Sequence, residues 1–197
     1  PTILTLVYYR CPGICSRLLS GVVDVLEKVE LEPGVDYEVL TISFDPTEDA
    51  PLAKRKKENF LRGFNEPFPE DAWRWMVGDS AAIATLTDVV GFRYKARGVD
   101  FDHPGVLTIL APDGKIVRYL NGITFLPFDV KMALMEAAEG KVGPTINRVL
   151  LYCFSYDREG GKYVFNLLKV TGTLFTIFAV AFAAFLVISS RSSRKEK

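Results

Sequence analysis

The chain has 197 residues, which is enough for one well-buried core, and its 24 Lys and Arg residues balance its 24 Asp and Glu residues. A formal net charge of zero argues against a general nucleic-acid-binding surface, and the sequence has no glycine-rich phosphate loop. Since His103 is the one histidine, any histidine-dependent chemistry must use it.

Strands and helices are expected to alternate along most of the chain. Residues 2–9 are rich in β-branched and aromatic residues and predict a buried strand, and the helical spacing of apolar residues predicts a helix over 15–29. The later predicted elements are strands at 37–44 and 73–77, helices at 51–62 and 79–92, a hairpin at 105–120 and a helix at 127–140. This order predicts an α/β layer fold with antiparallel strands added by the hairpin, which is the thioredoxin-like order.

The C-terminal part of the sequence has a different character. Residues 170–190 carry no charge, and as a helix they would be about 30 Å long, the thickness of a bilayer core. We therefore expect a transmembrane helix, and a buried core helix is the alternative. The predicted parts are a thioredoxin-like domain at 1–142, an extension with a second hairpin at 143–167, a transmembrane helix at 168–190 and a tail at 191–197.

The charges that flank this apolar run predict its orientation. The tail contains Arg191, Arg194, Lys195 and Lys197 against one acidic residue, Glu196. By the positive-inside rule the tail is expected in the cytoplasm and the globular domain on the periplasmic side of the inner (plasma) membrane. The sequence begins abruptly within a strand-like segment and shows no signal peptide, so we expect further sequence upstream, including an export signal.

Two cysteines, Cys11 and Cys15, lie where the first predicted strand gives way to the first predicted helix. A helix N-terminus offers unpaired N–H groups and a positive dipole end, and both favour a thiolate over a thiol. Pro12 suits a first helical turn, and side chains at positions i and i+4 can share one face of a helix. The pair can close reversibly to a disulfide or hold one soft metal ion. A purely structural disulfide is also possible, although so short a loop closes off little chain entropy.

A metal site needs a third ligand, and His103 offers the one imidazole. Its loop is expected to pack against the helix that carries the cysteines. Two thiolates and an imidazole suit copper in either oxidation state, whereas structural zinc normally takes a fourth protein ligand. The alternative is an ordinary loop histidine. Asp102 is expected at most to support the histidine, and Cys153 is predicted to be a small buried apolar residue.

Three segments, in this order along the chain, resemble the Sco/SenC family of thioredoxin-like copper proteins. The first is the CPxxC motif from Cys11 to Cys15, the second runs from Ser43 to Pro51, and the third is Asp102-His103 before the hairpin. The similarity covers residues 1–140.

The resemblance implies a three-layer thioredoxin-like domain with a copper site made of Cys11, Cys15 and His103. It also implies delivery of copper to the dinuclear copper centre of cytochrome c oxidase subunit II and, less directly, reduction of that subunit's cysteines. Two features depart from the family: Pro104 follows the histidine where many members have serine, and the predicted span is C-terminal where familiar members have an N-terminal anchor. The C-terminal span and the extension before it look like a bacterial branch.

Three functions therefore compete for this chain. It is a membrane-anchored copper metallochaperone, a thiol-disulfide oxidoreductase that uses Cys11 and Cys15 alone, or an accessory subunit of a respiratory membrane complex. Thiol-disulfide exchange needs no third ligand, so His103 discriminates the first two. A peroxidase would need an arginine and a threonine beside its cysteine, and only Arg10 and Arg17 lie near in sequence. The expected partners are a respiratory complex and membrane lipid, with no nucleic acid.

Overall fold

The computed structural model describes residues 1–98, 100–140, 154–157 and 162–165, together with residues 171, 172, 175, 176, 178 and 182. The chain divides into two compact units, Pro1–Gly143 and Pro144–Lys197, which are described separately. The first unit contains every residue of the candidate site.

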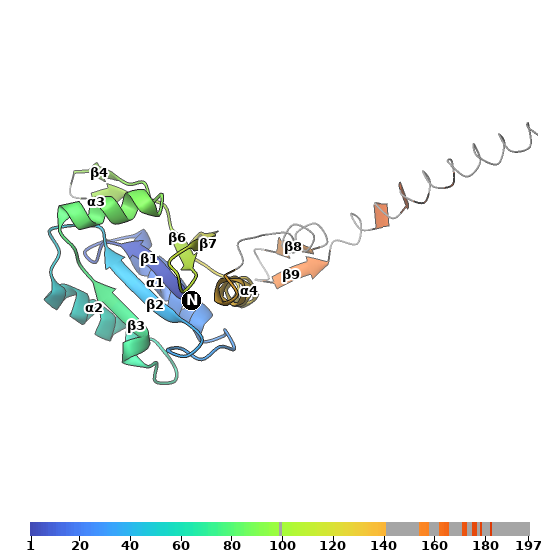
Figure 1. Ribbon diagram of the computed structural model, residues 1–197, viewed down its shortest axis with the longest axis horizontal. Coiled ribbons are helices and arrows are strands. Elements are labelled where there is room, and N and C mark those ends of the chain that lie inside the picture. The colour runs from blue at the N-terminus through green and yellow to red at the C-terminus, as the bar shows by residue number, and fades with distance from the viewer. Residues whose placement is uncertain are drawn as a thin grey trace, which may run out of the picture. The chain divides into compact units, whose positions relative to one another are not determined.

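A five-stranded sheet with the order β3-β2-β1-β6-β7 forms the centre of the first unit (Figure 1). Its strands are β1 (Thr2–Val7), β2 (Glu38–Ser43), β3 (Trp73–Met76), β6 (Val106–Leu110) and β7 (Ile116–Asn121). The first three are parallel to one another, and β6 is antiparallel to both β1 and β7. This mixed sheet confirms the predicted thioredoxin-like fold.

Helices cover both faces of this sheet. They are α1 (Ile14–Leu26), α2 (Ala50–Leu61), α3 (Ser80–Val89) and α4 (Pro127–Ala138), with a short 3-10 helix at Glu70–Ala72. On one face α1 contacts both α2 and α4, and α3 lies on the opposite face (Figure 1). The Tyr119 hydroxyl on β7 donates a hydrogen bond of 2.9 Å to the carbonyl of Val90 at the end of α3. The domain therefore has the three layers that were predicted.

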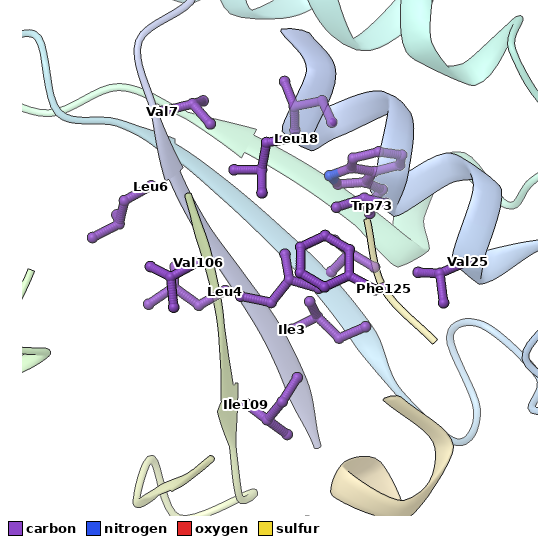
Figure 2. Packing of buried hydrophobic residues seen from close by; sticks show 14 of the residues in the cluster. Ile3, Leu4, Leu6, Val7, Leu18, Val25, Trp73, Val106, Ile109 and Phe125 are labelled. Carbon is purple, nitrogen blue, oxygen red and sulfur yellow. The ribbon is translucent and has the colours of Figure 1, made fainter. Parts of the chain in front are cut away.

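The core lies mainly between the sheet and the helices α1, α2 and α4. Ile3, Val39 and Trp73 are in register on three neighbouring strands, and all three are fully buried. Figure 2 shows Ile3 and Trp73 packed near Leu18 and Phe125. Because β1 is the middle strand, its side chains are buried on both faces, as is usual for a strand covered by helices on both sides. The start of the loop that follows β1 is therefore held in position by a buried strand.

The helix starts follow the local sequence. Asp49 accepts the N–H of Leu52 at the start of α2, and Asp79 accepts the N–H of Ala82 at the start of α3. Each aspartate satisfies a backbone donor that has no partner within its helix.

Three predictions need correction. The first helix spans Ile14–Leu26, so it begins one residue earlier and ends three residues earlier than predicted. The helix α3 spans Ser80–Val89 and likewise ends three residues earlier than predicted. A small hairpin of β4 (Lys95–Arg97) and β5 (Asp100–Asp102) was not predicted. Its strands have three residues each and are mostly exposed, so they carry no hydrophobic alternation that a sequence reading could detect.

The second unit contains the hairpin predicted within the extension at 143–167, as β8 (Phe154–Asp157) and β9 (Lys162–Phe165). The predicted transmembrane helix over 168–190 and Cys153 lie largely or wholly outside the described residues. Within the part of the chain that the structure describes, no helix has both the length and the apolar character needed to cross a bilayer.

Candidate metal centre

The two cysteines lie at the carboxyl end of the parallel strands, where β1 leads into α1. Cys11 is in the loop after β1, and its N–H donates to the carbonyl of Tyr8 at 3.2 Å, which closes a tight turn. Cys15 lies in the first turn of α1. Both thiols are free and buried. The buried ends of β1 and α1 thus hold the two sulfur atoms in place.

The sulfur of Cys11 occupies the place of a helix cap. It accepts hydrogen bonds from the N–H groups of Gly13 and Cys15, both at 3.4 Å, whereas the N-cap residue Gly13 has no side chain to do so. Cys11 therefore precedes the helix instead of sharing a helical face with Cys15. The expected effect of the helix N-terminus on a thiolate comes from these two donors.

The two thiols differ in acidity. Burial raises the pKa of Cys11, but its hydrogen bonds, first those from the N–H groups of Cys15 and Gly13, outweigh burial, so the pKa is lowered overall. Burial raises the pKa of Cys15 strongly, and the nearby negative charges of Cys11 and Glu48 add to this. Cys11 is thus the thiol that ionises first.

His103 reaches the cysteines from the loop between β5 and β6. Its Nε2 lies 3.2 Å from the sulfur of Cys15, and its Nδ1 lies 3.0 Å from the carbonyl oxygen of Pro104. A carbonyl only accepts, so Nδ1 carries the proton and the lone pair of Nε2 faces Cys15. Burial lowers the pKa of His103 and outweighs the opposing effects of the Pro104 carbonyl and the Asp102 charge. The imidazole is thereby kept in its neutral, ligand-competent form. The proline after the histidine does not remove this side chain from the site.

Aromatic rings surround the imidazole. The ring centroids of Phe44, Tyr8 and Phe92 lie 5.1, 5.9 and 6.1 Å from that of His103. These rings exclude water from one side of the site, which strengthens electrostatic interactions within it.

The carboxylates next to the histidine point elsewhere. Asp102 lies 3.7 Å from the guanidinium of Arg97 in an exposed ion pair, and Asp100 accepts a hydrogen bond of 3.3 Å from the Tyr8 hydroxyl. Asp102 influences His103 only through its charge, in keeping with the supporting role expected for it.

Sequence reasoning missed one buried group, Glu48. Its carboxylate accepts the N–H groups of Tyr9 at 2.6 Å and Arg10 at 2.7 Å, and the hydroxyl of Ser43 at 2.6 Å. It therefore fastens the loop that carries Cys11 to the segment after β2. The only signal in the sequence was an acidic residue within the segment from Ser43 to Pro51, where it looked like part of a turn.

The ligand atoms of Cys11, Cys15 and His103 all lie within 4.8 Å of one another. Two sulfurs and a neutral imidazole nitrogen fit a soft ion such as copper. Among the residues that the structure describes, no further His, Cys, Asp or Glu joins this group, so the fourth protein ligand typical of structural zinc is missing from it.

The chain matches the SCO1/SenC family over residues 1–138. It is also similar to the SCO1 protein homolog of Bacillus subtilis (strain 168), with 25% identity over 127 residues. That match covers 62% of this chain and 63% of the relative, so the chain spans less than two thirds of the relative's length.

Solved structures resemble the same unit. A putative electron transfer protein from Aquifex aeolicus VF5 has a TM-score of 0.62 and 28% identity, covering 71% of this chain and 79% of its own. ScoI of Arabidopsis thaliana, solved with copper bound, has a TM-score of 0.53 and 18% identity, covering 71% and 83% of the two chains. At that identity the second likeness concerns the fold alone.

Proposed function

The chain belongs to the SCO1/SenC family, and from that premise we propose that it binds copper through Cys11, Cys15 and His103. The observation that carries this proposal is the grouping of their three ligand atoms within 4.8 Å. Two thiolates and one imidazole form the donor set that copper accepts in either oxidation state.

Each residue has its own part in binding. Cys11 supplies a thiolate first, because its hydrogen-bond donors lower its pKa. Cys15 has a raised pKa and gives up its proton only when the metal arrives. His103 contributes a neutral nitrogen whose direction is set by the bond from Nδ1 to the Pro104 carbonyl.

We propose further that the chain is a membrane-anchored metallochaperone that delivers copper to the dinuclear centre of cytochrome c oxidase subunit II. Family membership supports this delivery role. The absence of charged residues from 170 to 190 and the basic tail at 191–197 support an anchor. In this proposal residues 1–142 form the domain on the periplasmic side of the inner membrane, 143–167 link it to the anchor at 168–190, and the tail is cytoplasmic. An accessory subunit of a respiratory complex would use the same anchor.

A second candidate function is thiol-disulfide exchange, favoured by the opposite pKa shifts of Cys11 and Cys15. Cys11, whose pKa is lowered, is suited to act as the attacking thiolate and as the leaving group in the exchange. Cys15, whose pKa is raised, would form the disulfide with it. The peroxidase alternative has less support, because the sulfur of Cys11 accepts hydrogen bonds from the backbone N–H groups of Gly13 and Cys15. The Arg10 guanidinium bonds Thr47 and, within the described residues, donates to neither cysteine sulfur.

Metal analysis of the reduced chain tests the main proposal. The full chain, purified in detergent and reduced without oxygen, should bind one copper per chain with a thiolate-to-copper absorption band. His103→Ala should weaken binding by more than the roughly 10- to 100-fold typical of losing an outer-shell partner, and should still form the disulfide. A copper ratio and spectrum identical to wild type would refute the three-ligand site and favour thiol-disulfide exchange.

Topology needs its own test. We expect a reporter fused after Lys197 to be located, and therefore active, on the cytoplasmic side of the membrane. A reporter that is active outside would contradict the proposed orientation and would place the thiol pair in a reducing compartment.

A further inference from the structure

Glu48 is a buried charged residue that the proposed site does not use as a ligand. It is 5% exposed and lies just before α2. Its three hydrogen-bond partners are the N–H groups of Tyr9 and Arg10 and the hydroxyl of Ser43. The guanidinium of Arg10 is bonded to Thr47, so none of the groups that bond the Glu48 carboxylate carries a positive charge.

The hydrogen-bond pattern identifies this group as an anion. Backbone N–H groups only donate, and they contact both carboxylate oxygens of Glu48. The hydroxyl of Ser43 is 2.6 Å from Glu48 but 3.4 Å from the carbonyl of Asp45, so its proton points at the carboxylate. All three bonds are short, as charge-assisted bonds are.

This anion is hydrogen-bonded to the segment that leads into the candidate metal site. Tyr9 and Arg10, which it holds, are the two residues immediately before Cys11. Although burial is the main cause of the raised pKa of Cys15, the charge of Glu48 contributes to it. Because Glu48 is buried, its field reaches the sulfur atoms with little screening by water or salt.

We propose that Glu48 sets the oxidation-state preference of the site by favouring cupric over cuprous copper. This inference rests on the proposed copper function. Two thiolates and a neutral imidazole around Cu(I) have a net charge of −1, and around Cu(II) a net charge of zero. A nearby buried anion destabilises the first complex relative to the second. The difference of one charge holds whatever the protonation state of the free thiols.

A matched pair of variants tests this inference. Glu48→Gln removes the buried charge. Asp49→Asn removes the exposed charge of the next residue but keeps the cap of α2, because asparagine caps a helix about as well as aspartate. Dissociation constants for Cu(I) and Cu(II) would be measured on the full chain, without oxygen and at one pH, by competition with chelators. The ratio of Cu(II) to Cu(I) affinity should fall about tenfold or more in Glu48→Gln and stay unchanged in Asp49→Asn.

A purely structural role for Glu48 gives a different result. Loosening of the turn alone would weaken both affinities by the same factor, and an unchanged ratio in Glu48→Gln would overturn the inference. Glu48→Asp keeps the charge and should keep the wild-type ratio even if both affinities fall. Glu48→Leu is a second neutral variant without a metal-ligating atom, and it should lower the ratio as Glu48→Gln does if the glutamine variant fails to fold. If the wild-type chain binds neither ion, the proposed function itself fails, so the wild-type titration separates the two failures.

Discussion

The two halves of the metal centre are built in opposite ways. Cys11 and Cys15 follow β1, the buried middle strand, and lie at the start of α1, whose inner face is in the core. His103 instead follows β4 and β5, two three-residue strands with mostly exposed side chains. The ion pair between Arg97 and Asp102 that spans these strands is itself 79% and 64% exposed.

This contrast separates two kinds of chemistry. The core sets the positions of the two sulfur atoms, so thiol-disulfide exchange needs only the cysteine half. Metal binding needs both halves, and therefore depends also on how well His103 is held. Changes in one half should be distinguishable from changes in the other.

Removing either thiol should have the largest effect, because it destroys the half on which both chemistries depend. Cys11→Ala and Cys15→Ala should each abolish copper binding and intramolecular disulfide formation, as measured by copper per chain and by thiol titration after mild oxidation. Cys153→Ala is the control and should retain both properties. A single-cysteine variant that holds copper at the wild-type ratio would show that the site lies elsewhere.

Phe44→Ala should remove the aromatic packing that joins His103 to the core. Phe44 is 1% exposed, and its ring centroid lies 5.5 Å from that of Tyr8 and 5.1 Å from that of His103. Removal of a buried phenylalanine ring typically costs about 3–5 kcal/mol, which urea denaturation of the metal-free chain would measure. Val89→Ala, at a 71% exposed position of α3, should change stability by at most about 0.5 kcal/mol. Equal losses in the two variants would contradict the role given to Phe44.

The lowered pKa of His103 predicts a pH dependence of smaller size. In the unfolded chain the imidazole takes up a proton near its ordinary value of about 6.5, whereas in the folded chain it does so only at lower pH. The unfolded state then binds more protons, so the free energy of unfolding should decrease as the pH falls from about 6.5 towards the folded-state value. His103→Gln should flatten this decrease in urea titrations between neutral and mildly acidic pH. A wild-type profile that His103→Gln leaves unaltered would show that the imidazole is not buried as described.

The smallest effect is expected at the exposed ion pair. Arg97→Ala should change the unfolding free energy by at most about 1 kcal/mol, the usual range for exposed pairs, and should leave copper affinity unchanged. A large loss of copper affinity in this variant would mean that the short hairpin, and not the aromatic packing, positions the histidine.

The helices and strands that bury apolar surface were predictable, because the spacing of their apolar residues indicates which side faces the core. The strands around Ile3 and Val39 and the helix that carries Leu18 all have such local signals. The candidate ligands were also predictable, since copper chemistry restricts the residue types and the chain has one histidine.

Features that depend on distant residues were not predictable in the same way. Glu48 is 39 positions away from Tyr9, whose N–H it accepts, and no local pattern marks a surface-type residue as buried. The β4–β5 hairpin has too few residues for a periodic pattern. The cap formed by the Cys11 sulfur was missed because the i, i+4 spacing indicates only that the two cysteines can share one helical face.

The hydrogen bond between His103 Nδ1 and the carbonyl of Pro104 joins two consecutive residues. The Pro104 carbonyl, which orients the imidazole, therefore moves together with His103, and a movement of the loop away from the sulfurs would not break this hydrogen bond. The ring of Pro104 also limits the backbone shapes that the loop can sample. In the proposed copper-delivery role, the imidazole could therefore keep its orientation while its loop moves, and the buried sulfurs would not have to move with it.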